Sequence, residues 1–391
     1  MKNLFKFTAL ATLFMVASCS KEAVIVRDAT NADAIRFSSF MDQTTKATIF
    51  DNSSIKATGF GIMGYSTSQL KWNDVSESAT PDFMYNQHVS YNSIVDNDWG
   101  YNPVKYWSNI AGDKYSFFAY APYSESTMAA SGIKLSASDA TGAPVISFTI
   151  NSDAKSMVDL VAGQEINIQQ QQDAVKFNLK HQLTRVTFSA TTNIAEDEQI
   201  GTGETYVVIK SMDLVESSKF YGSGDYTFDK NDTTGYDDFE SETDTEADHN
   251  QDGKWRNLAA YTQDYPFLSL LDVKQTSIGG YVESGVRIEN NKDIITPLFL
   301  EDQYLFLLPP DGQDGLKSVG DMKFLIEYQI VTADEALHAG YTASESKIST
   351  VSFPEASLKQ GRAYNIILTI DLTEIKVEAV VIDWDETETI E

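Results

Sequence analysis

The chain has 391 residues, of which 42% are hydrophobic and 22% are charged. At about 150 residues per domain this length allows two or three domains, and the apolar fraction suffices for a buried core. Asp and Glu number 57 against 29 Lys and Arg, giving a formal net charge of −28. Such a charge repels phosphate backbones, so we expect no nucleic-acid partner. One cysteine excludes an internal disulfide and a thiolate-rich metal site, and four histidines leave little material for a histidine-built catalytic centre.

The first nineteen residues have the features of an export signal. Lys2 and Lys6 are positive, and the apolar run from Leu4 to Val16 is shorter than the roughly 20 residues that span a membrane. The order Val16-Ala17-Ser18-Cys19 resembles a bacterial lipobox. That resemblance implies a signal peptide over residues 1–18, cleavage between Ser18 and Cys19, and acylation of Cys19, for instance with palmitate. An ordinary signal peptide with a chance cysteine is the alternative.

Strand patterns dominate the rest of the chain. The polar stretch 19–34 is typical of a tether. Period-2 or short apolar runs then predict strands, at Phe60–Tyr65, Tyr115–Tyr120, Val145–Ile150, Val175–Ala190, Tyr206–Ile209, Tyr304–Leu308, Lys323–Ile330, Lys347–Phe353, Tyr364–Leu372 and Ile375–Trp384. The apolar phase of the fourth run shifts at Thr184-Arg185, which indicates a bulge. Lys254–Tyr261 is a candidate helix.

This pattern predicts an all-β chain with more than one β-sandwich. We expect one sandwich over residues 35–168 and a second over 173–391. The glutamine run at 169–172 is the expected connection.

The acidic segment Asp225–Gly253 contains one candidate metal site. Asp248, Asn250 and Asp252 match the first half of a calcium loop, D-x-N-x-D-G. The carboxylate that normally closes such a loop falls on Ala259, which cannot coordinate calcium. We therefore expect a solvated acidic loop with at most weak calcium binding, and no cofactor.

Catalytic motifs are not apparent. His181 lies on the apolar face of its expected strand, and the chain has no G-x-S-x-G nucleophile motif. We expect a structural histidine bonded to a backbone carbonyl, and we expect that the protein is not an enzyme.

Several blocks, in order, resemble the fimbrillins, the pilins of the type V pili of Bacteroidota. The blocks are Ile35-Arg36-Phe37, Thr45-Lys46-Ala47, Phe60-Gly61-Ile62, residues 99–107, Phe117–Pro122, Asp159–Ala162, residues 177–188, the span from Leu358 to Tyr364, and Val380–Trp384. The resemblance implies two tandem transthyretin-like β-sandwich domains and a pilin that is exported as a lipoprotein to the outer membrane. It implies fimbrial location at the cell surface, with other pilin subunits as partners.

The resemblance also implies donor-strand exchange after proteolysis. In the family a trypsin-like protease removes the first strand, and a neighbouring subunit fills the groove with its own terminal strand, which is a form of β-augmentation. The strand carrying Ile35, Phe37 and Phe40 is the candidate for removal, and Lys46-Ala47 is the candidate cut, with lysine where the family usually has arginine. The stretch from Met41 to Lys46 is expected to be polar.

Val380, Ile382 and Trp384 form the candidate donor strand. The apolar face changes along this last segment: Ile375, Val377 and Ala379 lie on one side, and Val380, Ile382 and Trp384 on the other. The sequence leaves open whether the chain is a shaft, tip or anchor subunit. The alternative function is a non-polymerising surface lipoprotein that binds glycans or host proteins.

Overall fold

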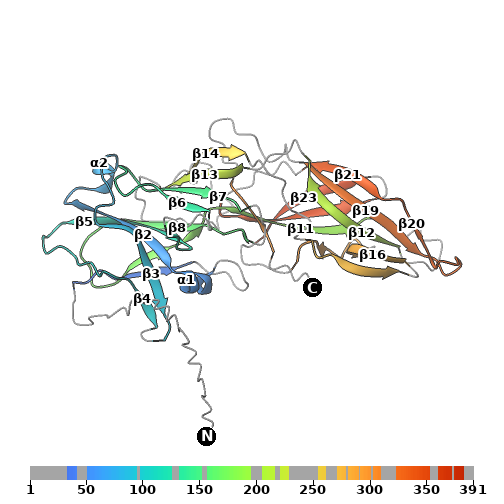
Figure 1. The fold of residues 1–391 in the computed structure, drawn as a ribbon, viewed down its shortest axis with the longest axis horizontal. Helices are drawn as coiled ribbons and strands as arrows, with labels where there is room; N and C mark the ends of the chain where they lie inside the picture. Colours follow the sequence, from blue (N-terminus) through green and yellow to red (C-terminus); the bar gives the residue numbers. More distant parts are fainter. Residues whose placement is uncertain are drawn as a thin grey trace, which may run out of the picture.

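Strands make up most of the chain. The computed structural model describes residues 33–41, 51–94, 97–125, 132–151, 156–194, 205–215, 221–228, 254–260, 271–278, 281–289, 291–300, 303–309, 323–352, 360–371 and 374–382. Two short helices occur within these ranges, α1 (Asn52–Thr58) and α2 (Trp72–Val75), so the prediction of an all-β chain is confirmed. The molecule is elongated, with the two halves of the chain at opposite ends (Figure 1).

A six-stranded antiparallel sheet is the middle layer of the first half, in the order β10-β8-β5-β2-β3-β4. Its strands are β2 (Phe60–Ser68), β3 (Met84–Asn92), β4 (Asp98–Gly100), β5 (Lys114–Ala121), β8 (Val161–Ile168) and β10 (Lys180–His181). Phe118 and Tyr120 of β5 enter one core cluster, and Phe117 and Ala119 enter another. Successive side chains of a strand point to opposite faces, so this sheet is buried on both faces. That burial explains the nearly continuous apolar run in β5.

A four-stranded sheet covers the first of these faces. Its order is β14-β13-β7-β6, and it consists of β6 (Ile133–Leu135), β7 (Val145–Thr149), β13 (Tyr221–Thr227) and β14 (Lys254–Ala260). The helix expected at Lys254–Tyr261 is therefore wrong. Residues 254–260 pair with β13, and Trp255 packs its ring 5.6 Å from that of Tyr226, which favours the extended chain over a helix.

A smaller third layer covers the opposite face. It contains β1 (Phe37–Phe40), which pairs in parallel with β9 (Val175–Asn178), and the helix α1. Asp51 caps α1 by accepting a hydrogen bond from the Ser54 amide at 2.7 Å, and the helix buries Ile55 against the sheet. The first strand is thus a member of a two-stranded ribbon on top of the sheet.

The second half is a sandwich of two sheets. One has the order β17-β11-β22-β23, with β18 also paired to β11; the other has the order β15-β16-β12-β19-β20, with β21 also paired to β19. The first contains β11 (Thr184–Thr192), β17 (Thr296–Pro297), β18 (Leu305–Leu307), β22 (Ala363–Ile370) and β23 (Ile375–Ile382). The second contains β12 (Thr205–Leu214), β15 (Lys274–Ile278), β16 (Tyr281–Glu289), β19 (Lys323–Ala333), β20 (Tyr341–Ala343) and β21 (Lys347–Ser352). Phe188 and Phe324 meet between the sheets, with ring centroids 5.3 Å apart.

Strand pairing crosses the division expected at residues 169–172. β9 follows that point but pairs with β1, and β13 pairs with β7. One core cluster runs from Phe118 in the first half to Phe324 in the second. β7 needs a partner on each side to avoid an open edge, and β13 supplies one of them. The sheets of the first half therefore contain strands from both sides of residues 169–172.

The single bulged strand expected over Val175–Ala190 is also wrong. The structure has three strands there, and each joins a different sheet: β9 pairs with β1, β10 with β8, and β11 with β22. The apolar alternation persists across the breaks because each segment has a buried face. Within the described part of the chain, no helix has the length and apolarity needed to span a membrane.

Candidate assembly site

The segment 33–41 lies between two neighbouring stretches of chain. On one side the amide of Ile35 donates to the carbonyl of Lys105 at 2.9 Å, and the amide of Trp107 donates to that of Asp33 at 2.8 Å. On the other side β9 donates to β1, from Val175 to the Arg36 carbonyl at 2.8 Å and from Leu179 to the Phe40 carbonyl at 2.9 Å. The first strand therefore fills a slot whose two walls both contribute backbone hydrogen bonds.

Side chains on the inner face of the segment fill apolar pockets. Ile35, Phe37 and Met41 retain 1%, 2% and 7% of their surface exposure. The Phe37 ring has aromatic neighbours on several sides, with centroids 5.3 Å from Tyr101, 5.1 Å from Phe117 and 6.0 Å from Phe177. Full burial of each such side chain contributes about 1.5–3 kcal/mol. Side-chain packing thus makes the main contribution to the attachment of this strand.

Two polar groups fix the ends of the strand. The Tyr101 hydroxyl donates to the carbonyl of Ile35 at 2.9 Å, and burial raises the pKa of Tyr101 to about 12. At the other end the Asn52 side chain accepts from the amide of Met41 at 2.9 Å and donates to its carbonyl at 3.2 Å. Asn52 is the first residue of α1, so the helix holds the end of the strand.

The outer face of the strand carries cations and a half-buried ring. The Arg36 guanidinium contacts the carbonyl of Gln172. The ammonium of Lys176, on β9, lies 4.2 Å from the centroid of the Phe40 ring, within the range of a cation–π contact. Phe40 is half-buried, so of the three expected residues only Ile35 and Phe37 lie deep in the slot.

The neighbourhood of the strand contains residues that sequence reasoning missed. Met41 is buried, which corrects the expectation of a polar stretch from Met41 to Lys46. It continues the alternation of Ile35 and Phe37, so extending that period by two steps would have found it. Tyr101, Phe177 and Lys176 come from distant segments, and no local pattern places them beside β1. Ser18, Cys19, Lys46 and Ala47 lie outside the described residues.

The last described strand is the candidate donor. β23 pairs antiparallel with β22 over eight consecutive register positions, from Ile370↔Ile375 to Ala363↔Ile382, without a shift. Val377 is half-buried, and Val380 is 37% exposed. The pairing therefore continues without a bulge at the point where the apolar residues change from one face of the strand to the other. Ile382 packs against Ala363 on the outer side of the sheet, and Trp384 lies outside the described residues.

His181 has a different partner from the expected one. Its Nδ1 lies 2.7 Å from the carboxylate of Asp159, whereas a backbone carbonyl was expected. The next residue, Gln182, is 3% exposed and joins three segments. Its carbonyl accepts from the Trp255 indole at 2.7 Å, its side-chain oxygen accepts from Gln360 at 2.6 Å, and its amide donates to Leu160 at 2.8 Å. His181 and Gln182 therefore belong to a structural junction between the halves of the chain.

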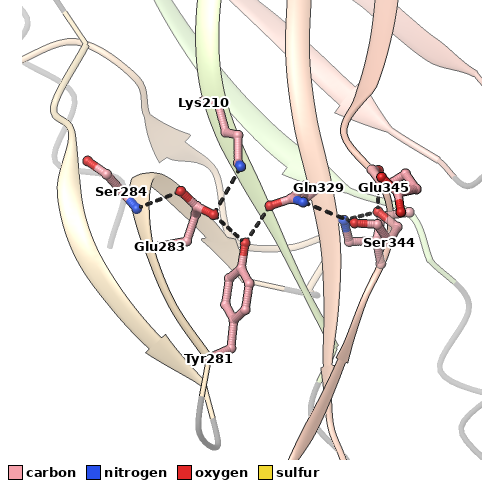
Figure 2. Close-up of polar contacts among 8 residues, drawn as sticks. Lys210, Tyr281, Glu283, Ser284, Gln329, Ser344 and Glu345 are labelled. Atoms are coloured by element: carbon pink, nitrogen blue, oxygen red, sulfur yellow. Dashed lines mark hydrogen bonds and ion pairs between the residues drawn. The ribbon is translucent and has the colours of Figure 1, made fainter.

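A second polar cluster lies on the outer face of the sheet that contains β12, β16 and β19 (Figure 2). The Tyr281 hydroxyl donates to Glu283 at 2.7 Å and contacts the side-chain amide of Gln329, and Lys210 pairs with Glu283 at 3.0 Å. The hydrogen bonds from Tyr281 and Lys210 lower the pKa of Glu283. Burial and the Glu283 charge raise the pKa of Tyr281, the opposite of what a tyrosine nucleophile or base needs. The cluster is suited to bracing the sheet.

A metal site within the described ranges would consist of several ligating side chains close together. No group of three or more His, Cys, Asp or Glu side chains in those ranges is arranged to hold a metal ion. The calcium-loop residues Asp248, Asn250 and Asp252 lie outside them.

Comparison with known proteins agrees with the resemblance seen in the sequence. Fimbrium subunit Fim1C of Phocaeicola vulgatus is 29% identical over 383 residues, which cover 94% of this chain and 92% of that protein. The crystal structure of a fimbrial protein from Bacteroides vulgatus superposes with a TM-score of 0.72 at 26% identity, covering 90% of this chain and 99% of that one. The family model described as fimbrillin-like matches residues 45–384. Because that match spans most of the sequence, the chain belongs to the fimbrillin-like family.

Proposed function

We propose that the protein is a fimbrial subunit that assembles with other pilin subunits by donor-strand exchange. Membership of the fimbrillin-like family supports the fimbrial role and a cell-surface location. The observation that carries the assembly mechanism is the slot around β1. Its backbone partners stand on both sides, and its pockets take Ile35, Phe37 and Met41, so a second extended strand with alternating apolar residues fits the same place.

Removal of the first strand is the step that opens the slot. Lys46 lies in the sequence between Met41, the last residue of the strand segment, and Asp51, the cap of α1. A cut after Lys46 separates the strand from the fold while leaving the middle sheet and α1 intact. The exposed pocket residues Phe117 and Phe177 then favour binding of another strand, because their surface would otherwise face water.

Export as a lipoprotein completes the proposal. Cys19, acylated after signal cleavage, holds the precursor at the outer membrane through the tether at 19–34. A cut after Lys46 removes this anchor together with the first strand, so one cleavage both releases and activates the subunit. Cys19→Ala should abolish labelling by a fatty-acid analogue and retention in the membrane fraction, and unchanged labelling would contradict the lipid anchor.

Limited trypsin digestion tests the assembly step. We expect the purified precursor to be monomeric and to form oligomers once the bond after Lys46 is cut, as measured by light scattering and intact mass. Lys46→Ala should block oligomer formation, whereas Lys56→Ala, which removes an exposed lysine of α1, should leave it unchanged. A cut protein that has lost its first strand and stays monomeric at high concentration would overturn strand exchange between copies of this chain.

A second candidate role is that of a terminal, adhesive subunit. If β23 keeps all eight of its register positions with β22 during assembly, the chain accepts a strand without giving one. Such a subunit would sit at a fibre end and contact glycans or host proteins there. For an accepting subunit the purified, cut protein would stay monomeric and would bind an added donor strand, whereas a shaft subunit would form oligomers that deletion of residues 383–391 abolishes.

A further inference from the structure

Lys176 is a cation at the rim of the slot in a chain whose net charge is −28. It is exposed, and its Cα partner across the ribbon is Ser38 of β1. No carboxylate among the described residues forms an ion pair with it; the contact that occupies its ammonium is the Phe40 ring, on the strand whose removal is proposed above. Loss of the first strand therefore leaves this cation without its partner.

The end of the chain has the opposite character. Residues 383–391 contain five carboxylates, Asp383, Asp385, Glu386, Glu388 and Glu391, and no lysine or arginine. Two copies of so acidic a protein repel each other, and an acidic tail approaching an acidic surface is unfavourable unless a local cation receives it. Lys176 stands where such a tail would pass if the donor segment entered the slot.

We infer that Lys176 selects the incoming strand by pairing with Asp383 or Asp385 of a second copy of this chain. This inference rests on the proposed strand exchange and specifies its partner. The occupant is the segment 380–391, with two neighbouring members of the row Val380, Ile382 and Trp384 directed into the pockets of Ile35 and Phe37.

The alternation of side chains along a strand determines which donor residues face Lys176. In the segment 33–41 the odd-numbered residues 35, 37 and 41 enter the pockets, so positions 36, 38 and 40 face outward, on the side of Lys176. A donor with Val380, Ile382 and Trp384 inward turns Val381, Asp383 and Asp385 outward. If the donor runs in the direction of β1 and Ile382 takes the place of Phe37, Asp383 stands at position 38, directly opposite Lys176. If Trp384 takes that aromatic pocket, Asp385 stands at position 38. Either register brings an aspartate to the same lysine.

Only a small part of the donor has to detach from its own sheet. Freeing residues 380–391 breaks the last three of the eight register positions between β22 and β23, at Asn365, Tyr364 and Ala363. The twelve freed residues extend up to about 40 Å at 3.3 Å per residue, which is sufficient to run along the slot of a neighbouring subunit that lies next to the end of β23. Val380 is already 37% exposed, so releasing it uncovers little new apolar surface.

The test measures binding of a labelled peptide with the sequence of residues 375–391 to the full-length protein. A recognition site for a sequence-specific protease, inserted between Gln43 and Thr44, allows the first strand to be cut without touching other lysines. Fluorescence anisotropy then gives the affinity for the cut wild type. Lys176→Gln should weaken binding by about two- to fivefold and Lys176→Glu by about tenfold, because opposite charges facing each other across strands attract and like charges repel. Lys134→Glu, an exposed change on β6 in the other layer, makes the same change in net charge and should have no effect.

A charge swap decides between selection and a general effect on folding. A peptide with Asp383→Lys and Asp385→Lys should bind Lys176→Glu better than wild type, and the preference should fade as salt screens the pair. If the cut protein binds the original peptide and Lys176→Glu changes the affinity by less than twofold, the inference is wrong while strand exchange stands. If the cut wild type rebinds a peptide of residues 35–46 and takes up no 375–391 peptide, donation by this segment fails together with the inference.

Discussion

The first and last strands of this protein are held in opposite ways. β1 shares four register positions with β9, and the segment 33–41 that contains it buries Ile35, Phe37 and Met41 almost completely. β23 shares eight positions with β22, yet its described side chains are half-buried or exposed. Side-chain pockets therefore dominate the attachment of the first strand, and backbone pairing dominates that of the last.

The difference bears on how strands could be exchanged between copies. Backbone hydrogen bonds accept almost any extended segment, whereas pockets accept only side chains of fitting size at alternate positions. A slot defined by pockets is selective once emptied. A strand that is attached mainly through backbone hydrogen bonds forms equivalent bonds in another subunit, so its transfer costs little free energy. The slot and the last strand are thus suited to the accepting and the donating roles.

The largest expected effect is at Phe37. Phe37→Ala should lower the free energy of unfolding by about 3–5 kcal/mol, because it empties a pocket lined by Tyr101, Phe117 and Phe177. Phe40→Ala, on the outer face, should lower it by about 1 kcal/mol. Urea denaturation of the uncut protein measures both. Equal effects of the two changes would show that side-chain pockets do not dominate this strand.

Gly163 offers a way to disturb β9 without touching β1. A Cβ at this position of β8 would lie 2.3 Å from the backbone oxygen of Asn178, at the end of β9. Gly163→Ala should therefore push β9 off the sheet and lower the free energy of unfolding by about 1–3 kcal/mol. Hydrogen exchange should speed up at β1 and β9 and stay unchanged at β23; faster exchange at β23 would mean that the two ends are not independent.

Smaller effects are expected in the last strand. Val377→Ala removes two methyl groups from a half-buried position and should lower the free energy of unfolding by about 1 kcal/mol. Val380→Ala, at an exposed position, should change it by no more than about 0.5 kcal/mol. Thermal unfolding followed by circular dichroism distinguishes these values. A loss at Val380 as large as that at Phe37 would remove the contrast between the strands.

The remaining prediction concerns alkaline pH, outside the conditions of the others. Tyr101, which donates to Ile35, has its pKa raised by burial from an ordinary value of 10 to about 12. The protonated form is favoured in the folded state, so its stabilising contribution is complete below pH 10 and is lost as the pH rises toward 12. Tyr101→Phe should flatten this part of the stability profile. The control, Tyr91→Phe, removes an exposed hydroxyl from β3 and should leave the profile unchanged.

Local pattern was sufficient to predict much of the fold. Alternating residues predicted the strand at Phe37, and a short apolar run predicted the strand at Tyr115–Tyr120, because burial of one face or of both faces determines the pattern of apolar residues in a strand. The helix expected at 254–261 was wrong because residues 254–260 take their conformation from pairing with β13, a partner that no local signal reveals. The prediction of a single strand over 175–190 was wrong for a related reason. The apolar period continues there while the chain passes among three sheets.

The candidate site was predictable only in part. Ile35 and Phe37 follow from alternation alone. Tyr101, Phe177 and Lys176 surround them through the fold of distant segments, and their position depends on the layer that β9 and α1 add to the sheet.

The junction at Gln182 has a mechanical consequence for a fibre. The backbone and side chain of this buried residue bond to Trp255 of β14, Leu160 and Gln360, and one core cluster contains residues of both halves of the elongated molecule (Figure 1). We expect tension applied at the slot and at the last strand to pass through packed side chains of this junction. Extension of a fibre under load should then begin at the contacts between subunits.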